Sequence, residues 1–425
     1  MRAALSPSPV EIFAAAIFAL AVVHTFSTRL FERLARRQPE HAGLWHLLGE
    51  VEVVFGFWAM FLLVLVAVQV GADDAIGYLE SRSFTEPAFV FVIMVIAASR
   101  PVLDFSGAVL QRLAQMLPLA SANGYYFVTL SIGPLLGSLI TEPAAMTLTA
   151  LLLRDRFFGG NAPKPFMYGT IGVLFVNISI GGTLTSFAAP PVVMVAEQWG
   201  WTTAFMLKVF GWKAAAAVLT NAAGAAFAFR AYLNELPQPR AATIKIDTPR
   251  WIIAAYLLFL AGVVIFSHHP FLFLALFLFF LGFSEAYKRY RGRLILREGL
   301  LVAFFLAGLV VLGGWQRWWL QPLLADMQPT VLFASATLLT VITYNAALTY
   351  LGSLVEGVSH DFKYSLVAGA VTGGGLTVIA NAPNPAGFAL LKGSFEDGAI
   401  SPFGLLAAAA APTLVAACAF QLLPG

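Results

Sequence analysis

Glu142 and Lys213 are charged residues that fall within long apolar stretches of this sequence. Glu142 comes directly before Pro143, and proline near the first position of a helix favours a helix start at that point. A carboxyl group at a helix start can act as a cap, or it can bind a sodium ion or a proton. Ionisable side chains inside apolar segments mark ion and proton pathways, because burying their charge is costly. We therefore predict that Glu142 and Lys213 are candidates for proton coupling.

Glu50 and Glu52 form a second acidic pair, directly before the apolar run 53–70. Their position favours a role at a helix start near the membrane surface. A role in proton coupling remains the alternative.

Neutral oxygen ligands cluster at two glycine-rich stretches, 181–191 and 373–383, each of which ends in proline. Glycine weakens a helix and proline removes a backbone donor, so both stretches predict breaks in membrane helices. Carbonyl groups of unwound backbone can coordinate sodium, whereas the N-termini of half-helices can bind anions. The breaks alone therefore do not decide whether the substrate is a cation or an anion. The predicted ion- or substrate-binding residues at these breaks and at two hairpin tips are Thr141, Glu142, Thr183, Thr185, Ser186, Thr343, Asn345, Thr377, Asn381 and Asn384.

The two stretches belong to an internal repeat. Residues 140–145 (ITEPAA) correspond to 342–347 (ITYNAA), and 181–191 (GGTLTSFAAPP) share six of eleven positions with 373–383 (GGGLTVIANAP). Each half is predicted to cross the membrane an odd number of times, so the two copies would run in opposite directions. Inverted repeats with breaks at matching places are typical of secondary transporters that bind substrate near the membrane midplane.

The composition requires a membrane to surround these elements. Of the 425 residues, 59% are hydrophobic and only 11% are charged, with a mean hydropathy of +0.82. Soluble domains carry about 25% charged residues, so a soluble enzyme, a disulfide scaffold and a disordered chain are all excluded. Cys418 is the single cysteine, and we find no nucleotide-binding or metal-ligand motif.

The apolar runs predict an all-α polytopic membrane protein with about ten transmembrane helices and two re-entrant helical hairpins. The two inverted-topology repeats would be 1–232 and 251–425, joined by a cytoplasmic linker at 233–250. The first repeat contains scaffold spans within 9–103, a hairpin at 123–153, a broken span at 166–198 and a span at 201–231. The second contains scaffold spans within 251–320, a hairpin at 329–354, a broken span at 364–391 and a span at 399–421.

Basic residues test this layout, because cytoplasmic loops of membrane proteins are enriched in Lys and Arg. With the N-terminus outside, 19 of the 25 basic residues fall in loops predicted to be cytoplasmic. Those loops are 28–43, 98–122, 154–165, 230–250, 287–298 and 392–398. The layout therefore predicts that both termini lie outside.

Four motifs resemble those of a known family: residues 45–52 (WHLLGEVE), 138–145 (SLITEPAA), 181–185 (GGTLT) and 373–384 (GGGLTVIANAPN). Over nearly its whole length the chain resembles the bacterial putative Na+/H+ antiporter family, within the ion transporter superfamily. Carriers of that superfamily have an inverted repeat with two hairpins and often Ser-Asn-Thr at the tips. Here Thr-Glu-Pro at 141–143 and Thr-Tyr-Asn at 343–345 stand at the tips instead.

The residues and the resemblance together predict a transporter, not an enzyme, that exchanges sodium or another monovalent cation for protons by an elevator-type mechanism. Sodium and protons would compete for Glu142, with Thr183, Thr185, Thr377 and Asn381 as neutral ligands. The resemblance also implies a homodimer in the bacterial inner membrane. We expect no cofactor, no metal beyond the transported cation and no nucleic acid as partner. The alternative is a sodium-coupled carrier of a small organic anion such as a dicarboxylate, and a channel of similar architecture also remains open.

Overall fold

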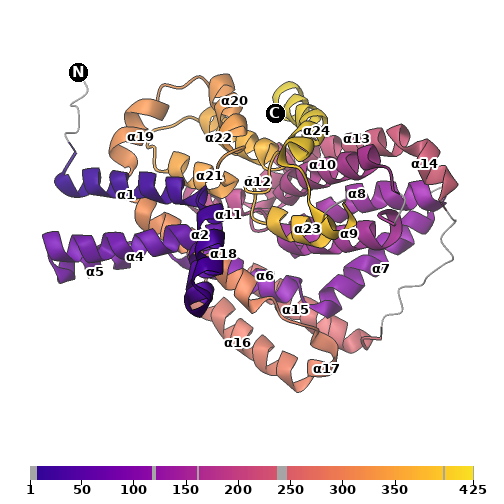
Figure 1. The fold of residues 1–425 in the computed structure, drawn as a ribbon, viewed down its shortest axis with the longest axis horizontal. Helices are drawn as coiled ribbons and strands as arrows, with labels where there is room; N and C mark the ends of the chain where they lie inside the picture. The colour runs from indigo at the N-terminus through magenta and orange to yellow at the C-terminus, as the bar shows by residue number, and fades with distance from the viewer. Residues whose placement is uncertain (1–6, 117–120, 160–161, 237–246, 396–397, 425) are drawn as a thin grey trace. The chain divides into compact units, whose positions relative to one another are not determined.

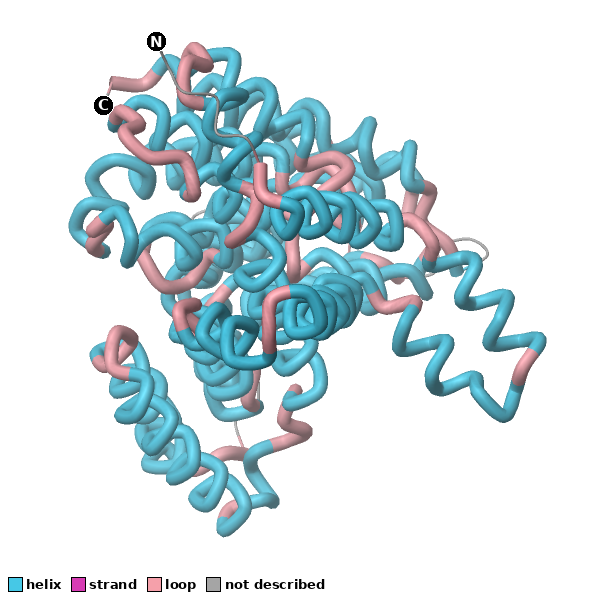
Figure 2. The backbone as a smooth tube through the Cα atoms, turned by 90° about the vertical axis from the view of Figure 1, so that its left-hand side faces the viewer, coloured by secondary structure: helices cyan, strands magenta, loops and turns pink. Residues whose placement is uncertain are grey.

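The computed structural model describes residues 7–116, 121–159, 162–236, 247–395 and 398–424. Within these ranges every regular element is a helix, drawn in cyan in Figure 2, and none is a strand. An apolar chain favours helices because a helix satisfies its backbone hydrogen bonds internally, which lipid cannot do. The all-helical prediction is confirmed. The linker residues 237–246 lie outside the described ranges.

Two compact units make up the chain, and each combines separate stretches of sequence. Unit 1 comprises Met1–Phe91, Leu296–Gln328 and Tyr350–Lys363, and unit 2 comprises Val92–Ile295, Pro329–Thr349 and Tyr364–Gly425. Three helices have residues in both units: α6 (Thr85–Ala97), α21 (Asn345–Ser353) and α22 (His360–Gly373). Both predicted hairpin tips and both predicted breaks therefore belong to unit 2.

Unit 1 is built around two apolar helices that meet backbone to backbone. Its elements are α1 (Pro9–Thr25), α2 (Thr28–Arg37), η1 (Pro39–His41), α3 (Ala42–Leu48), α4 (Val51–Gln69), α5 (Ala72–Glu80), α18 (Leu296–Gly313) and α19 (Arg317–Leu324). A side chain at Gly308 of α18 would overlap the backbone at Gly56 of α4. Small residues at such a crossing let two membrane helices approach closely.

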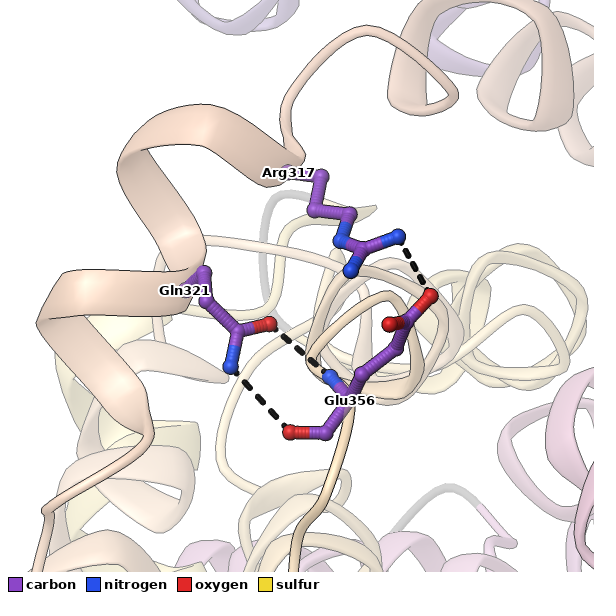
Figure 3. Close-up of polar contacts among 3 residues, drawn as sticks. All are labelled: Arg317, Gln321 and Glu356. Carbon is purple, nitrogen blue, oxygen red and sulfur yellow. Dashed lines mark hydrogen bonds and ion pairs between the residues drawn. The ribbon is translucent and has the colours of Figure 1, made fainter. Parts of the chain in front are cut away.

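A polar clamp in unit 1 holds the segment that follows α21 against α19 (Figure 3). The Gln321 side chain donates to the Glu356 carbonyl (3.1 Å) and accepts from its backbone N–H (2.9 Å). Arg317, one turn away on α19, forms an ion pair with the Glu356 carboxylate. The clamp satisfies backbone groups of a loop that has no helix of its own to pair them.

Unit 2 contains the longer list of helices, many of which are labelled in Figure 1. They are α7 (Arg100–Met116), α8 (Ser121–Ile140), α9 (Glu142–Phe157), α10 (Lys164–Gly181), η2 (Gly182–Leu184), α11 (Pro190–Trp199), α12 (Thr203–Met206), the π-helix η3 (Leu207–Gly211), α13 (Trp212–Ala228), α14 (Arg230–Glu235), α15 (Arg250–Ile265), α16 (Pro270–Ala286), α17 (Lys288–Arg291), α20 (Pro329–Leu339), α23 (Asn384–Leu391), η4 (Lys392–Ser394) and α24 (Pro402–Leu422). The predicted scaffold spans at 251–286 thus group with the hairpins, as α15 and α16.

Helix α10 forms the centre of unit 2, and nearly all of its residues are buried. Pro134 in α8 has no N–H, so the carbonyl of Leu130 lacks its usual helical partner. The Asn177 amide of α10 donates to that carbonyl (2.9 Å), and Asn221 of α13 donates to Asn177 (2.9 Å). Asn221 also donates to Pro412 of α24 (3.2 Å), so two asparagines tie four helices together. Both residues therefore make hydrogen bonds between helices.

Five helices among the described residues are long and apolar enough to cross a membrane, or up to seven when two bent pairs count as one span each. Helices α15, α16 and α20 are apolar but shorter. The chain is thus a helical protein with several candidate membrane spans, and the figure of ten stays a prediction.

Candidate functional site

The first hairpin breaks at a single strained residue, Thr141. Helix α8 ends at Ile140 and α9 begins at Glu142, with Thr141 between them at φ 73°. Thr141 is the one non-glycine residue at positive φ in the described ranges. Such backbone conformations cost about 1–3 kcal/mol and gather at functional sites. The Thr141 hydroxyl makes no capping bond, and its oxygen is buried without a partner.

The first broken span wraps around this tip. Helix α10 passes through η2 into extended backbone at Thr185, and helix resumes as α11 at Pro190. Ser138, at the end of α8, links the first hairpin tip to this break, because its hydroxyl donates to the Gly181 carbonyl (2.7 Å) and accepts from the Leu184 N–H (2.9 Å). Thr185 in turn donates to the Ser138 carbonyl (2.7 Å). Sequence reasoning missed Ser138, although it opens the 138–145 motif.

Glu142 is fully buried against the break of α10. A Cβ atom at Gly182 would lie 2.6 Å from Glu142 Cγ and 2.9 Å from its Cδ, so only glycine leaves room for this carboxyl group. Asn381 donates from its side-chain amide to Glu142 Oε2 (2.8 Å). The other carboxyl oxygen, Oε1, and the Asn381 oxygen Oδ1 are buried and have no partner. Glu142 is therefore not a helix cap here, and its partner comes from the second half of the chain.

The second hairpin tip and the second break, at 373–383, are joined by a contact like the one that joins the first tip and the first break. Helix α20 ends at Leu339 and α21 begins at Asn345, whose N–H donates to the Ala380 carbonyl (3.0 Å). Thr377 donates to the Val341 carbonyl (2.9 Å), as Thr185 donates to Ser138 in the first half.

Asn384 and Gly374 complete the second break. Asn384 donates to the carbonyls of Gly374 (2.7 Å) and Thr377 (2.8 Å). A Cβ atom at Gly374 would meet Ser179 of α10 and the Asn345 amide. Ser179 also donates to the Val371 carbonyl of α22 (2.7 Å). The second break, at 373–383, thus lies beside the end of α10, where the first break begins, within unit 2.

Apart from Ser186, the predicted oxygen ligands divide into three groups. Glu142 and Asn381 are in direct contact, and Thr141 directly precedes Glu142 in the chain. The buried hydroxyls of Thr183 and Thr185 donate to backbone carbonyls, which leaves their lone pairs able to accept. Asn345, Thr377, Asn384 and the partly buried Thr343 belong to the second break, and the buried oxygens of Thr343 and Asn384 also have no partner.

Ser186 faces a pocket of about 420 Å³ rather than the buried cluster. Its hydroxyl pairs with Thr203 (3.1 Å), and Phe187 of the same break also lines the pocket. Glu197 and His268 lie at the same pocket, with 3.8 Å between the Glu197 carboxylate and His268 Nδ1. The unwound segment of the first broken span is therefore open to the surface at this point.

Lys213 is buried, as predicted, but it pairs with a phenol. Its ammonium donates to the Tyr364 hydroxyl (3.0 Å) and lies 4.7 Å from that ring, and Tyr364 donates to the Phe420 carbonyl (2.6 Å). Among the described residues no carboxylate lies within ion-pair distance of Lys213. The π-helix η3 ends just before it, and a Cβ atom at Gly211 would lie 3.2 Å from Leu184 of the first break. The sequence signalled neither the π-helix nor Tyr364.

Glu50 and Glu52 lie at the start of α4 in unit 1. Glu50 is the residue before the helix and forms an ion pair with Arg297 of α18. Their position fits the helix-start interpretation. Neither residue belongs to the unit that contains Glu142.

Comparison with known proteins agrees with this geometry. A search of curated protein sequences gave no significant match. The profile of a protein family described as "Putative Na+/H+ antiporter" matches residues 9–423, nearly the entire chain. A match of this extent covers both hairpin tips, both breaks and every candidate span. The chain therefore belongs to the putative Na+/H+ antiporter family.

Proposed function

We propose that this multi-pass membrane protein exchanges sodium, or another monovalent cation, for protons at Glu142. The observation that carries the proposal is a fully buried carboxyl group with one hydrogen-bond donor and free oxygens around it. A buried negative charge is costly unless a proton or a cation compensates it. Because Glu142 can hold only one of the two at a time, binding of one releases the other. Competition of this kind is the basis of exchange.

The ligand set supports a monovalent cation. Oε1 of Glu142, Oδ1 of Asn381 and Oγ1 of Thr141 are buried oxygens without partners. Carbonyl groups at unwound helices coordinate sodium in other secondary transporters. One carboxylate contributes one negative charge, which one monovalent cation neutralises.

The internal repeat supports a single site in each chain. At the repeat offsets, Glu142 corresponds to Tyr344 and Asn381 corresponds to Ala189, so the site related to this one by the repeat would have neither the carboxylate nor the amide. We infer that one cation is exchanged for one proton. Exchange should then be unaffected by a membrane potential that valinomycin and potassium impose.

The alternative of an organic-anion carrier is not favoured. An anionic substrate at the two breaks would meet the Glu142 carboxyl group, and Lys213 is engaged by Tyr364. Lys213 would therefore not be free to pair with the anion.

An elevator-type mechanism remains our proposal for alternating access. Both hairpin tips, both breaks and the Glu142–Asn381 contact lie within unit 2, so the site can move as one body without being dismantled. The pocket at Ser186, Glu197 and His268 is the proposed route from the surface to the first break. The inverted repeat, the homodimer, the bacterial inner membrane and the outside termini belong to this proposal.

Reconstitution tests the function. Purified protein in liposomes that contain a pH-sensitive dye should move protons when sodium, lithium or potassium is added outside. Glu142→Gln should abolish this movement, because an amide releases no proton. Glu50→Gln is the matched control, since it removes a carboxylate from unit 1 and should leave exchange intact. Full activity of Glu142→Gln would disprove the assignment.

A further inference from the structure

A groove between α7 and α15 in unit 2 has no assigned role. It encloses about 450 Å³ and is lined mainly by apolar side chains, among them Phe105, Ala108 and Ala254. Two arginines, Arg112 of α7 and Arg250 of α15, complete the lining. An apolar groove with two cationic groups is chemically complementary to an amphiphilic anion.

Both guanidinium groups are available to a ligand. Arg112 and Arg250 are exposed, and neither has an ion pair or hydrogen bond with any described residue. The nearest acidic side chain on α7, Asp104, is occupied by Arg100 (3.5 Å) and by the Thr248 hydroxyl (3.3 Å). Asp104 therefore does not neutralise either arginine.

Aromatic residues beside this groove are of the type that lies at the depth of lipid headgroups. Trp251, next to Arg250, is 54% exposed and packs edge-on against Tyr287 (5.0 Å). Trp and Tyr are enriched at membrane–water interfaces, where their rings span the apolar and polar layers. Farther along α15, Leu258 is 72% exposed, as expected for a helix that lipid covers.

The basic residues that follow α16 add positive charge to unit 2. Lys288 and Arg289 of α17 are exposed. Helix α17 packs against α7, and a Cβ atom at Gly292 would lie 3.0 Å from the Arg100 side chain. Basic pockets between membrane helices bind the headgroups of anionic phospholipids.

We propose that the α7–α15 groove binds an anionic phospholipid, with its phosphate at Arg112 and Arg250 and an acyl chain along Phe105, Ala108 and Ala254. The two guanidinium groups, which have no partner among the described residues, determine the charge of the occupant, and the apolar walls require a hydrocarbon chain. This site is independent of the ion exchange at Glu142.

Native mass spectrometry of the full chain in detergent tests the proposal. The protein is titrated with phosphatidylglycerol and with phosphatidylcholine of the same acyl chains. Each arginine near an anionic headgroup strengthens binding about fivefold, so Arg112→Gln with Arg250→Gln should weaken the first phosphatidylglycerol site about 25-fold. Binding of phosphatidylcholine should be unchanged.

Two further variants distinguish binding in the groove from general electrostatic attraction of anionic lipid to the protein. Lys288→Gln with Arg289→Gln removes the same charge outside the groove and should keep the preference for phosphatidylglycerol. Ala254→Trp keeps both arginines but fills the groove, and should also lose the tight site. The proposal is overturned if the wild type binds both lipids equally, if the double arginine variant binds like wild type, or if the control loses as much.

Discussion

Replacing Gly182 by alanine should displace the Glu142 carboxyl group and little else. Gly182 has φ −74° and ψ −8°, a conformation open to any L-residue, so alanine introduces no backbone strain. The added Cβ would lie 2.6 Å from Glu142 Cγ, whereas ordinary contact begins at 3.4 Å. Glu142 Cγ must therefore move by about 0.8 Å, and the carboxyl group that it carries must shift with it.

That displacement sets the size of the effect. Misplacing a functional group by about 1 Å can cost about 100-fold in activity. We expect the sodium concentration for half-maximal exchange to rise about 10- to 100-fold. Overpacking should also lower the free energy of unfolding by about 1–3 kcal/mol.

Dye-loaded liposomes measure the first quantity, and thermal unfolding in detergent measures the second. Gly224→Ala is the matched control, because a Cβ atom at Gly224 of α13 meets nothing within 4 Å. This control should exchange ions as the wild type does. A folded Gly182→Ala protein with the sodium dependence of wild type would refute the packing of Glu142 against the break.

Three further substitutions test neighbouring contacts. Asn381→Leu removes the donor to Glu142 and a free oxygen, so half-maximal exchange should need at least about 10-fold more sodium in liposomes; an unchanged value would exclude Asn381 as a ligand. Asn177→Leu leaves the Leu130 carbonyl unpaired and should cost about 1–3 kcal/mol of unfolding free energy, with the sodium dependence unchanged. Thr141→Gly relieves the positive φ and should stabilise the protein by about 1 kcal/mol in thermal unfolding, but weaken sodium binding; unchanged binding would leave Thr141 a purely structural role.

The positions of the helix breaks could be predicted from sequence. The predicted tip at 140–145 contains the observed break at Thr141, and the stretch 181–191 contains the observed break between Gly181 and Pro190. These predictions succeed because glycine and proline act on their own backbone, whatever packs around them. The π-helix before Lys213 escaped prediction, since no residue type signals the extra residue in its turn.

The partners of the site residues could not be predicted in the same way. The fold pairs the buried Lys213 with the phenol of Tyr364, 151 residues away, and nothing in the local sequence indicates this partner. The hydroxyls of Thr183 and Thr185 were candidate ligands, and both donate to backbone carbonyls. Which atom a side chain reaches depends on where helices cross, and helix crossings depend on packing between distant segments.

Sequence alone determined that this chain belongs in a membrane, where its helices break and which acid is the leading candidate for the site, because hydropathy, glycine and proline act locally. It identified Glu142 as an embedded carboxyl group because so few charges interrupt the apolar runs. Only the tertiary structure decided that Gly182 makes room for that group and that Asn381 donates to it from 239 residues away. Such contacts form where helix breaks from distant parts of the chain pack together, and no local sequence pattern predicts which breaks will pack together.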